Sequence, residues 1–204
     1  MLELYLIRHG QSTSNKEGRI QGQQDVPLSP EGLRQADALA KRLKEVSFDS
    51  IYSSDLQRAK QTALQVYPEN SLILNARLRE IHLGHFEGRL WDELDEQERE
   101  QFSRFLTGPY DLPVPGGESS DDLRFRALAW LESLPNQGRV AAFTHGGLIV
   151  SILQSILGRP PVRHWQEQSG WGFWIENTSI TELKISSGYK TIARVSDAAH
   201  LETL

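Results

Sequence analysis

Short apolar runs alternate with segments in which apolar residues recur every three or four positions, and this pattern continues along most of the chain. The runs at residues 2–7 and 140–143 are typical of buried strands, whereas the spacing over 29–43 is typical of a helix with one apolar face. Strands that alternate with amphipathic helices predict an α/β fold, a three-layer α/β/α sandwich with a mainly parallel, mixed sheet. In such folds ligands bind beyond the carboxyl ends of the strands.

The same pattern predicts the individual elements. Strands are expected at 2–7, 48–54, 70–75, 138–147 (ending in a polar turn), 171–176, 179–185 and 189–195, the last two as a hairpin around Ser187-Gly188. Helices are expected at 28–46, 54–67, 92–106, 120–134 and 148–157.

Two helix starts carry local signals. Ser29 is a good N-cap and Pro30 suits the first turn of the helix that follows, and Ser54 or Asp55 is expected to begin the next helix. The core face predicted for the first of these helices consists of Leu33, Ala36, Leu39, Ala40 and Leu43.

Residues 77–118 are less regular than the rest. They contain a strongly charged helical stretch and a loop rich in proline and glycine, which ends in "PGGES". A long irregular insertion in a compact domain often covers or binds a ligand. We therefore expect one domain over residues 1–204, with a substrate-covering insertion at about 77–118.

Charge and composition exclude several functions. The net charge is −5 with both signs mixed along the chain, which argues against nucleic acid as a partner and means that any anion site must be built locally. The absence of cysteine excludes disulfides and thiolate metal sites. With no signal-peptide pattern and no apolar segment long enough to span a bilayer, we expect a cytoplasmic protein that does not bind membranes.

Two predicted strands end alike. One closes in Arg8-His9-Gly10, and the other in Thr144-His145-Gly146. Either histidine alone would most simply be a structural residue. If both strands are central and parallel, however, His9 and His145 lie at one site, and a glycine after each permits a tight turn and close approach of a ligand.

Arg58 falls in the first turn of a predicted helix. Alone it would be read as a solvated arginine. Beside Arg8 and the two histidines it completes a cationic group suited to phosphate or another dense anion, next to a helix N-terminus that favours anions.

Several motifs together resemble the histidine phosphatase superfamily, the phosphoglycerate mutase-like family. They occur in the family's order along nearly the whole chain: "LIRHG", "SN", "QG", "SSDLQRAKQTA", "LREIHLGHFEG", "PGGES" and "FTHGG". The resemblance implies that neutral His9 attacks phosphorus and forms a phosphohistidine, with a backbone carbonyl holding its other ring N–H. It implies that Arg8, Arg58 and His145 stabilise the phosphoryl oxygens.

The resemblance also assigns roles to other residues. Glu80 becomes the general acid; on its own it would be one surface glutamate among many. The predicted substrate contacts are Ser12, Asn15, Gln21, Gly22, His85 and Gly146. Asn15 and Gln21 could equally serve in turns, and His85 could equally be a surface residue.

In this family the same kind of site catalyses two reactions, phosphate ester hydrolysis and phosphoglycerate isomerisation. Mutases of the family carry a longer insertion and an adjacent Arg pair, whereas this chain is shorter and contains no Arg-Arg dipeptide. We therefore favour a phosphatase acting on a small phosphorylated metabolite without metal or cofactor, and a homodimer is possible. The alternatives are a cofactor-dependent phosphoglycerate mutase and a non-catalytic phospho-ligand-binding protein, which would need no general acid.

Overall fold

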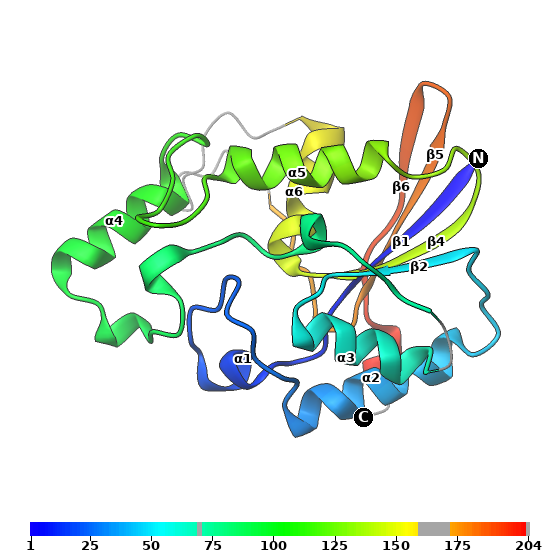
Figure 1. The fold of residues 1–204 in the computed structure, drawn as a ribbon, viewed down its shortest axis with the longest axis horizontal. Helices are drawn as coiled ribbons and strands as arrows, with labels where there is room; N and C mark the ends of the chain where they lie inside the picture. Colours follow the sequence, from blue (N-terminus) through cyan, green and yellow to red (C-terminus); the bar gives the residue numbers. More distant parts are fainter. Residues whose placement is uncertain (69–70, 159–171, 203–204) are drawn as a thin grey trace.

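A computed structural model describes residues 1–68, 71–158 and 172–202 of the chain (Figure 1). In this part of the chain, one sheet has the strand order β3-β2-β4-β1-β5-β6. Its strands are β1 (Leu2–Arg8), β2 (Ser50–Ser53), β3 (Ile73–Leu74), β4 (Gly138–Thr144), β5 (Ile180–Ser186) and β6 (Tyr189–Asp197). Strands β3, β2, β4 and β1 run parallel, and β5 and β6 are antiparallel to their neighbours. The predicted mainly parallel, mixed sheet is thereby confirmed.

Helices cover both faces of this sheet, so the three-layer prediction is confirmed as well. Figure 1 shows α2 and α3 on one face and α5 and α6 on the other. The helices are α1 (Thr13–Glu17), α2 (Pro30–Leu43), α3 (Gln57–Val66), α4 (Glu96–Thr107), α5 (Ser120–Glu132) and α6 (Gly146–Leu157). Short 3₁₀ turns are η1 (Ala76–Leu78), η2 (Gly84–Phe86), η3 (Trp91–Glu93) and η4 (Ala199–Leu201).

The alternation of side chains along β1 builds two cores. Leu4 and Leu6 point to one face and join a cluster with Trp130 of α5 and residues of α6. Ile7 points to the other face and joins a cluster with Leu39 of α2. Because both faces of a central strand are covered, β1 is apolar on both sides.

Some local predictions were wrong, each for a tertiary reason. Leu33 on α2 is 45% exposed because it lies beside the buried face of the helix, which contains the predicted Ala36, Leu39 and Leu43 together with Gly32 and Ala38. Helix α3 begins at Gln57 without a side-chain cap, although Ser54 or Asp55 was expected to begin it. Both residues have other partners, His145 for the Ser54 hydroxyl and Arg79 for the Asp55 carboxylate.

The segment expected as a strand at 171–176 forms no strand over residues 172–176, and Trp171 lies outside the described residues. A backbone carbonyl of this segment, that of Ile175, instead accepts a hydrogen bond from the Arg8 side chain. The polar loop after β1 contains the short helix α1, which the sequence pattern did not predict.

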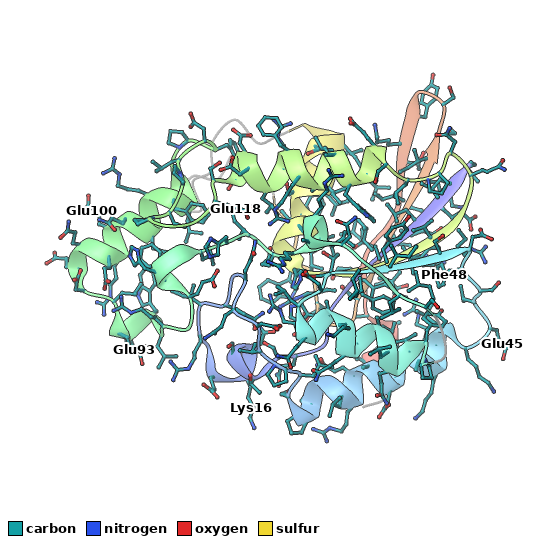
Figure 2. The ribbon with its side chains drawn as sticks, viewed as in Figure 1. Lys16, Glu45, Phe48, Glu93, Glu100 and Glu118 are labelled. Carbon is teal, nitrogen blue, oxygen red and sulfur yellow. The ribbon has the colours of Figure 1, made fainter. Side chains whose placement is uncertain are left out.

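The 77–118 segment lies beyond the carboxyl ends of the central strands (Figure 1). A small apolar cluster holds it together: Phe86, Leu94, Phe102, Phe105 and Val114. The labelled Glu93 and Glu100 lie on its outer side, whereas Glu118 lies where the segment meets α5 (Figure 2). That this segment covers a substrate stays a prediction.

Within the described ranges, no helix has both the length and the apolar character needed to cross a bilayer.

Candidate functional site

The parallel pairing of β1 and β4 brings the two His-Gly strand ends together. Arg8 is in register with Thr144, and the next residue, His9, donates its backbone N–H to the Thr144 carbonyl at 2.9 Å. The rings of His9 and His145 lie edge to face, with centroids 5.0 Å apart. The prediction that both histidines occupy one place at the carboxyl edge of the sheet is therefore supported by the geometry.

Two hydrogen bonds define the state of the His9 ring. Nδ1 lies 2.7 Å from the Gly10 carbonyl, which can only accept, so Nδ1 carries the proton. Nε2 lies 3.2 Å from Arg58 Nε, which can only donate, so Nε2 presents its lone pair. Burial lowers the pKa of His9 well below its usual range, and the Arg58 and Arg8 guanidiniums lower it further. His9 is therefore neutral, with a nucleophilic Nε2.

The backbone around His9 is also held. The Gly10 N–H donates to the Thr62 hydroxyl at 3.0 Å, and the Asn177 side-chain amide donates to the His9 carbonyl at 2.9 Å. A Cβ on Gly10 would lie 2.6 Å from the Gly32 carbonyl oxygen of α2. Close packing against α2 thus gives this glycine a structural role, besides the ligand approach expected from the sequence.

Arg58 has a completely buried side chain. While Nε faces His9, Nη1 donates to the Gln24 carbonyl and Nη2 to the Gly22 carbonyl, both at 2.8 Å. Burial lowers the pKa of Arg58 to about 10, with partial compensation from nearby carboxylates of which Glu80 contributes most. The guanidinium therefore remains charged near neutral pH.

Two buried nitrogens at the site lack a hydrogen-bond partner among the described residues. One is Arg8 Nε, although Arg8 Nη1 donates to the Ile175 carbonyl. The other is His145 Nδ1; the second nitrogen of the same ring, Nε2, is hydrogen-bonded to the Ser54 hydroxyl at 2.9 Å. Burial, with the Arg58 charge second, lowers the pKa of His145 well below its usual range. Buried polar nitrogens without partners are rare, and here two lie around one neutral imidazole.

Glu80 reaches the site from the segment after η1. Its Oε2 accepts the Gly147 backbone N–H at 2.9 Å, in the first turn of α6, and its Oε1 accepts the N–H of Ile81 at 3.0 Å. A Cβ on Gly147 would lie 2.4 Å from Glu80 Oε1, so this position must be a glycine for the carboxyl group to lie there. Glu80 is thereby held at the N-terminus of the helix that follows His145.

Four of the predicted substrate contacts stabilise the loop after β1. Ser12 caps α1 and forms a capping box with Asn15, and its hydroxyl donates to the Gln21 side-chain oxygen. Gly22 has a φ of 52° and offers its carbonyl to Arg58. These contacts support the turn-forming interpretation, and a substrate role for the four residues stays a prediction.

The other two predicted contacts differ in position. Gly146 begins α6, and its Cβ direction points to Arg8 Nε at 3.6 Å, inside the site. His85 is exposed in η2, and its ring packs on Phe86 with centroids 4.3 Å apart. A substrate contact through His85 stays a prediction.

Sequence reasoning missed several residues that position the site. Ser54 and Thr62 lie within the quoted "SSDLQRAKQTA" motif, so their place in the motif was a usable signal. Asn177 had no such signal, because only the fold brings it to His9.

No cluster of three or more histidine, aspartate or glutamate side chains suited to a metal occurs in residues 1–68, 71–158 and 172–202.

A neutral imidazole close to two arginines, a second histidine and a carboxyl group has the side chains that phosphoryl transfer through histidine needs. Comparison with known proteins agrees with this class. The model of the histidine phosphatase superfamily (branch 1) matches residues 4–198, and the chain belongs to this superfamily.

Relatives carry more than one activity in their names. The chain is 36% identical over 213 residues of alignment to the "Probable phosphoglycerate mutase GpmB" of Escherichia coli, covering 99% of this chain and 96% of that protein. Among solved structures, Bacillus stearothermophilus YhfR superposes with a TM-score of 0.86 at 32% identity, over 98% of this chain and 100% of that one. A mutant phosphoserine phosphatase from Entamoeba histolytica, in complex with phosphoserine, superposes with a TM-score of 0.84 at 29% identity, over the same shares.

Proposed function

We propose that this protein is a metal-independent phosphomonoesterase that acts on small phosphorylated metabolites through a phosphohistidine at His9. The observation that carries the proposal is the pair of unpartnered buried nitrogens, Arg8 Nε and His145 Nδ1, beside a neutral His9 whose Nε2 presents its lone pair. With the Ser54 hydroxyl donating to His145 Nε2, the proton of this ring is on Nδ1, and a bound phosphoryl group would accept from both nitrogens and bring phosphorus to the nucleophile.

In the first half of the reaction, His9 Nε2 attacks phosphorus as the bond to the ester oxygen breaks. Arg58 Nε must release the Nε2 lone pair, and its N–H then serves a phosphoryl oxygen. The two carbonyls that bind Nη1 and Nη2 keep the guanidinium in place during this exchange. Arg8 and His145 supply further donors to the developing charge.

Glu80 acts as the general acid and then as the general base. Its carboxylic acid donates a proton to the leaving oxygen as the alcohol departs, and its carboxylate then accepts a proton from the water that attacks the phosphohistidine. Inorganic phosphate leaves and His9 returns to its neutral form. The contact with Gly147 supports this role because it holds the carboxyl group close to the helix that follows His145.

The test is phosphate release from p-nitrophenyl phosphate, phosphoserine and 3-phosphoglycerate, each with and without EDTA. We expect activity that survives EDTA and disappears in His9→Ala while thermal unfolding of the variant stays cooperative. Full activity in His9→Ala, or loss of activity in EDTA that added metal restores, would refute the proposal. Glu80→Gln should slow esters with poor leaving groups more than p-nitrophenyl phosphate.

Phosphoglycerate mutase is the second candidate, and the 36% identity to a protein named as one favours it. A mutase returns the phosphoryl group to the bound substrate, whereas a phosphatase transfers it to water. The absence of an Arg-Arg dipeptide supports the phosphatase. Isomerisation of 3-phosphoglycerate faster than its hydrolysis would establish the mutase instead.

A further inference from the structure

The segment that carries Glu80 has little regular structure of its own. It joins η1, whose short 3₁₀ turn contains Arg77, to η2, and Arg79 and Glu80 themselves belong to no helix or strand. An irregular backbone places a side chain accurately only when other groups hold it. The hydrogen bonds of the Arg77, Arg79 and Glu80 backbone carbonyls therefore decide where the Glu80 carboxyl group lies.

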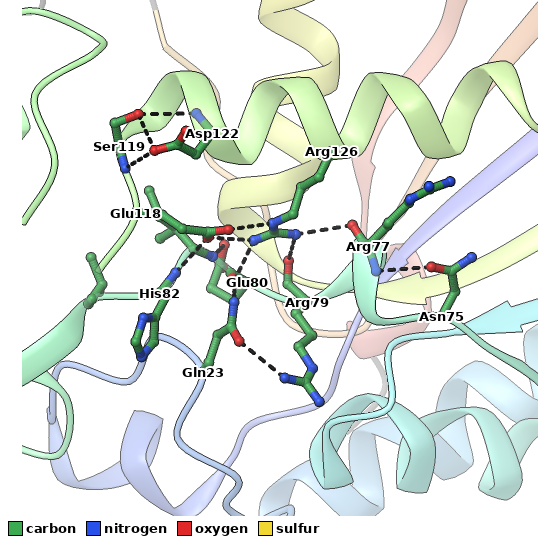
Figure 3. Close-up of polar contacts among 12 residues, drawn as sticks. Gln23, Asn75, Arg77, Arg79, Glu80, His82, Glu118, Ser119, Asp122 and Arg126 are labelled. Atoms are coloured by element: carbon green, nitrogen blue, oxygen red, sulfur yellow. Dashed lines mark hydrogen bonds and ion pairs between the residues drawn. The ribbon is translucent and has the colours of Figure 1, made fainter. Parts of the chain in front are cut away.

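One guanidinium binds all three carbonyls. Arg126 of α5 donates from Nη1 to Arg77 O at 3.0 Å and to Arg79 O at 2.6 Å, and from Nη2 to Glu80 O at 2.7 Å (Figure 3). A second donor, the Gln23 side-chain amide, reaches Glu80 O at 3.1 Å. Arg126 thus fixes the backbone on both sides of the Glu80 Cα.

Glu118 holds Arg126 and the far end of the segment. Its Oε1 accepts Arg126 Nε at 2.8 Å, and its Oε2 accepts Arg126 Nη2 and the backbone N–H of His82, both at 2.9 Å (Figure 3). The Glu118 backbone N–H donates to the His82 carbonyl at 2.8 Å. The side chains of Arg126 and Glu118 are 17% and 22% exposed, so water competes little for these bonds.

These contacts use the whole hydrogen-bonding capacity of Arg126. An arginine has five N–H donors, and here one is on Nε, two on Nη1 and two on Nη2, each with an acceptor. No donor is left for a phosphate. Arg126 is therefore suited to holding the backbone of the segment that carries Glu80, and not to binding substrate.

We propose that Arg126 and Glu118 are positioning residues for the general acid, holding the backbone of residues 77–82 so that the Glu80 carboxyl group stays on the α6 N-terminus. The inference rests on the proposed function, in which Glu80 protonates the leaving group. Displacement of a reacting group by about 1 Å can cost about 100-fold in rate. Loss of the Arg126 contacts should produce a displacement on this scale.

The test compares leaving groups in single-turnover phosphorylation of the enzyme. For Arg126→Gln we expect an about 100-fold slower first turnover with an alkyl phosphate such as glycerol 2-phosphate, and a change below about threefold with p-nitrophenyl phosphate, which leaves without an acid. Adding Arg126→Gln to Glu80→Gln should then have little further effect, because the acid is already absent.

The matched control is Arg124→Gln. Arg124 lies on the same helix, pairs with Asp121 and stacks on the Phe125 ring, and has no bond to residues 77–82 among the described contacts. We expect it to leave both first-turnover rates unchanged. Equal slowing of both substrates in Arg126→Gln, or full additivity with Glu80→Gln, would overturn the proposal and indicate a general structural role.

Two further measurements keep the outcomes separable. If Arg126→Gln does not unfold cooperatively, Glu118→Gln tests the same proposal. In this variant an amide N–H₂ group replaces a carboxylate oxygen that accepts hydrogen bonds, so it faces another donor. We expect the same selective slowing of the alkyl phosphate, and its absence would refute the proposal. Failure of the proposed function would be seen in the wild-type enzyme as no phosphate release. Failure of the positioning role alone would leave the Glu80→Gln effect intact and remove only the effect of Arg126→Gln.

Discussion

Replacing Arg58 with lysine tests the central cation of the site. The side chain is fully buried and donates three hydrogen bonds, to His9 Nε2 at 3.2 Å and to the carbonyls of Gln24 and Gly22 at 2.8 Å. A lysine keeps one nitrogen in place of the planar fork, so it cannot reach all three acceptors in the same geometry. The substitution therefore removes the anchoring while leaving a basic group.

The expected cost has two parts. A hydrogen bond from a charged group contributes about 1.5–3 kcal/mol, and losing one or two of them should lower the free energy of unfolding by about 1.5–6 kcal/mol. A missing donor to the transition state costs about 100- to 1000-fold in kcat. Burial already lowers the pKa of Arg58 to about 10. The ordinary pKa of a lysine is lower than that of an arginine, and full burial can lower it by about 3–5 further. A lysine at this position should therefore be partly neutral at pH 8.

Urea unfolding and the pH dependence of kcat/KM measure the two parts separately. We expect Arg58→Lys to be slow at pH 8 and to recover partly toward pH 6.5, where the lysine gains its proton while His9 stays neutral. Arg42→Lys is the control, since Arg42 pairs with Asp197 outside the site. A kcat/KM for Arg58→Lys within threefold of wild type at every pH, with unchanged stability, would refute the assigned role.

Two other predictions follow from the burial around His9. Because His9 and His145 are neutral in the fold but free to protonate near pH 6.5 when unfolded, the unfolded chain binds more protons as the pH falls. The free energy of unfolding should decrease below about pH 6.5 by up to about 1.4 kcal/mol per pH unit for each histidine, and urea titrations that show no pH dependence between 5 and 7 would contradict this. Gly10→Ala places a Cβ 2.6 Å from a backbone oxygen and should cost about 1–3 kcal/mol, whereas Gly172→Ala, which meets nothing within 4 Å, should cost nearly nothing; equal melting temperatures of the two variants would count against the packing role.

The main elements of the fold could be predicted from the sequence because their signals are local. The Ser29 cap with Pro30 marked the start of α2, and the apolar runs marked β1 and β4. The start of α3 could not be predicted in this way. Serine is a favourable N-cap residue, but the Ser54 hydroxyl is hydrogen-bonded to His145, which comes from a distant part of the chain.

Most residues of the candidate site could likewise be predicted from the sequence. Two strands ending in His-Gly, and a basic residue in a helix's first turn, indicated an anion site through the topology of a parallel sheet. Glu80 was assigned only through resemblance to a family, because nothing local separates it from other glutamates. Its contact with Gly147 and its backbone bond to Arg126 are what distinguish it now.

Local pattern therefore specified most of the strands and helices, and the edge of the sheet at which the histidines and arginines lie. Tertiary structure decides three features of the site: the protonation state of His9, the two unpartnered nitrogens and the use of every Arg126 donor. Each arises from hydrogen bonds between residues far apart in sequence, such as the bond across 49 positions from Arg58 to His9. Hydrogen-bond geometry over such separations depends on packing, and packing cannot be read from the periodicity of a single segment.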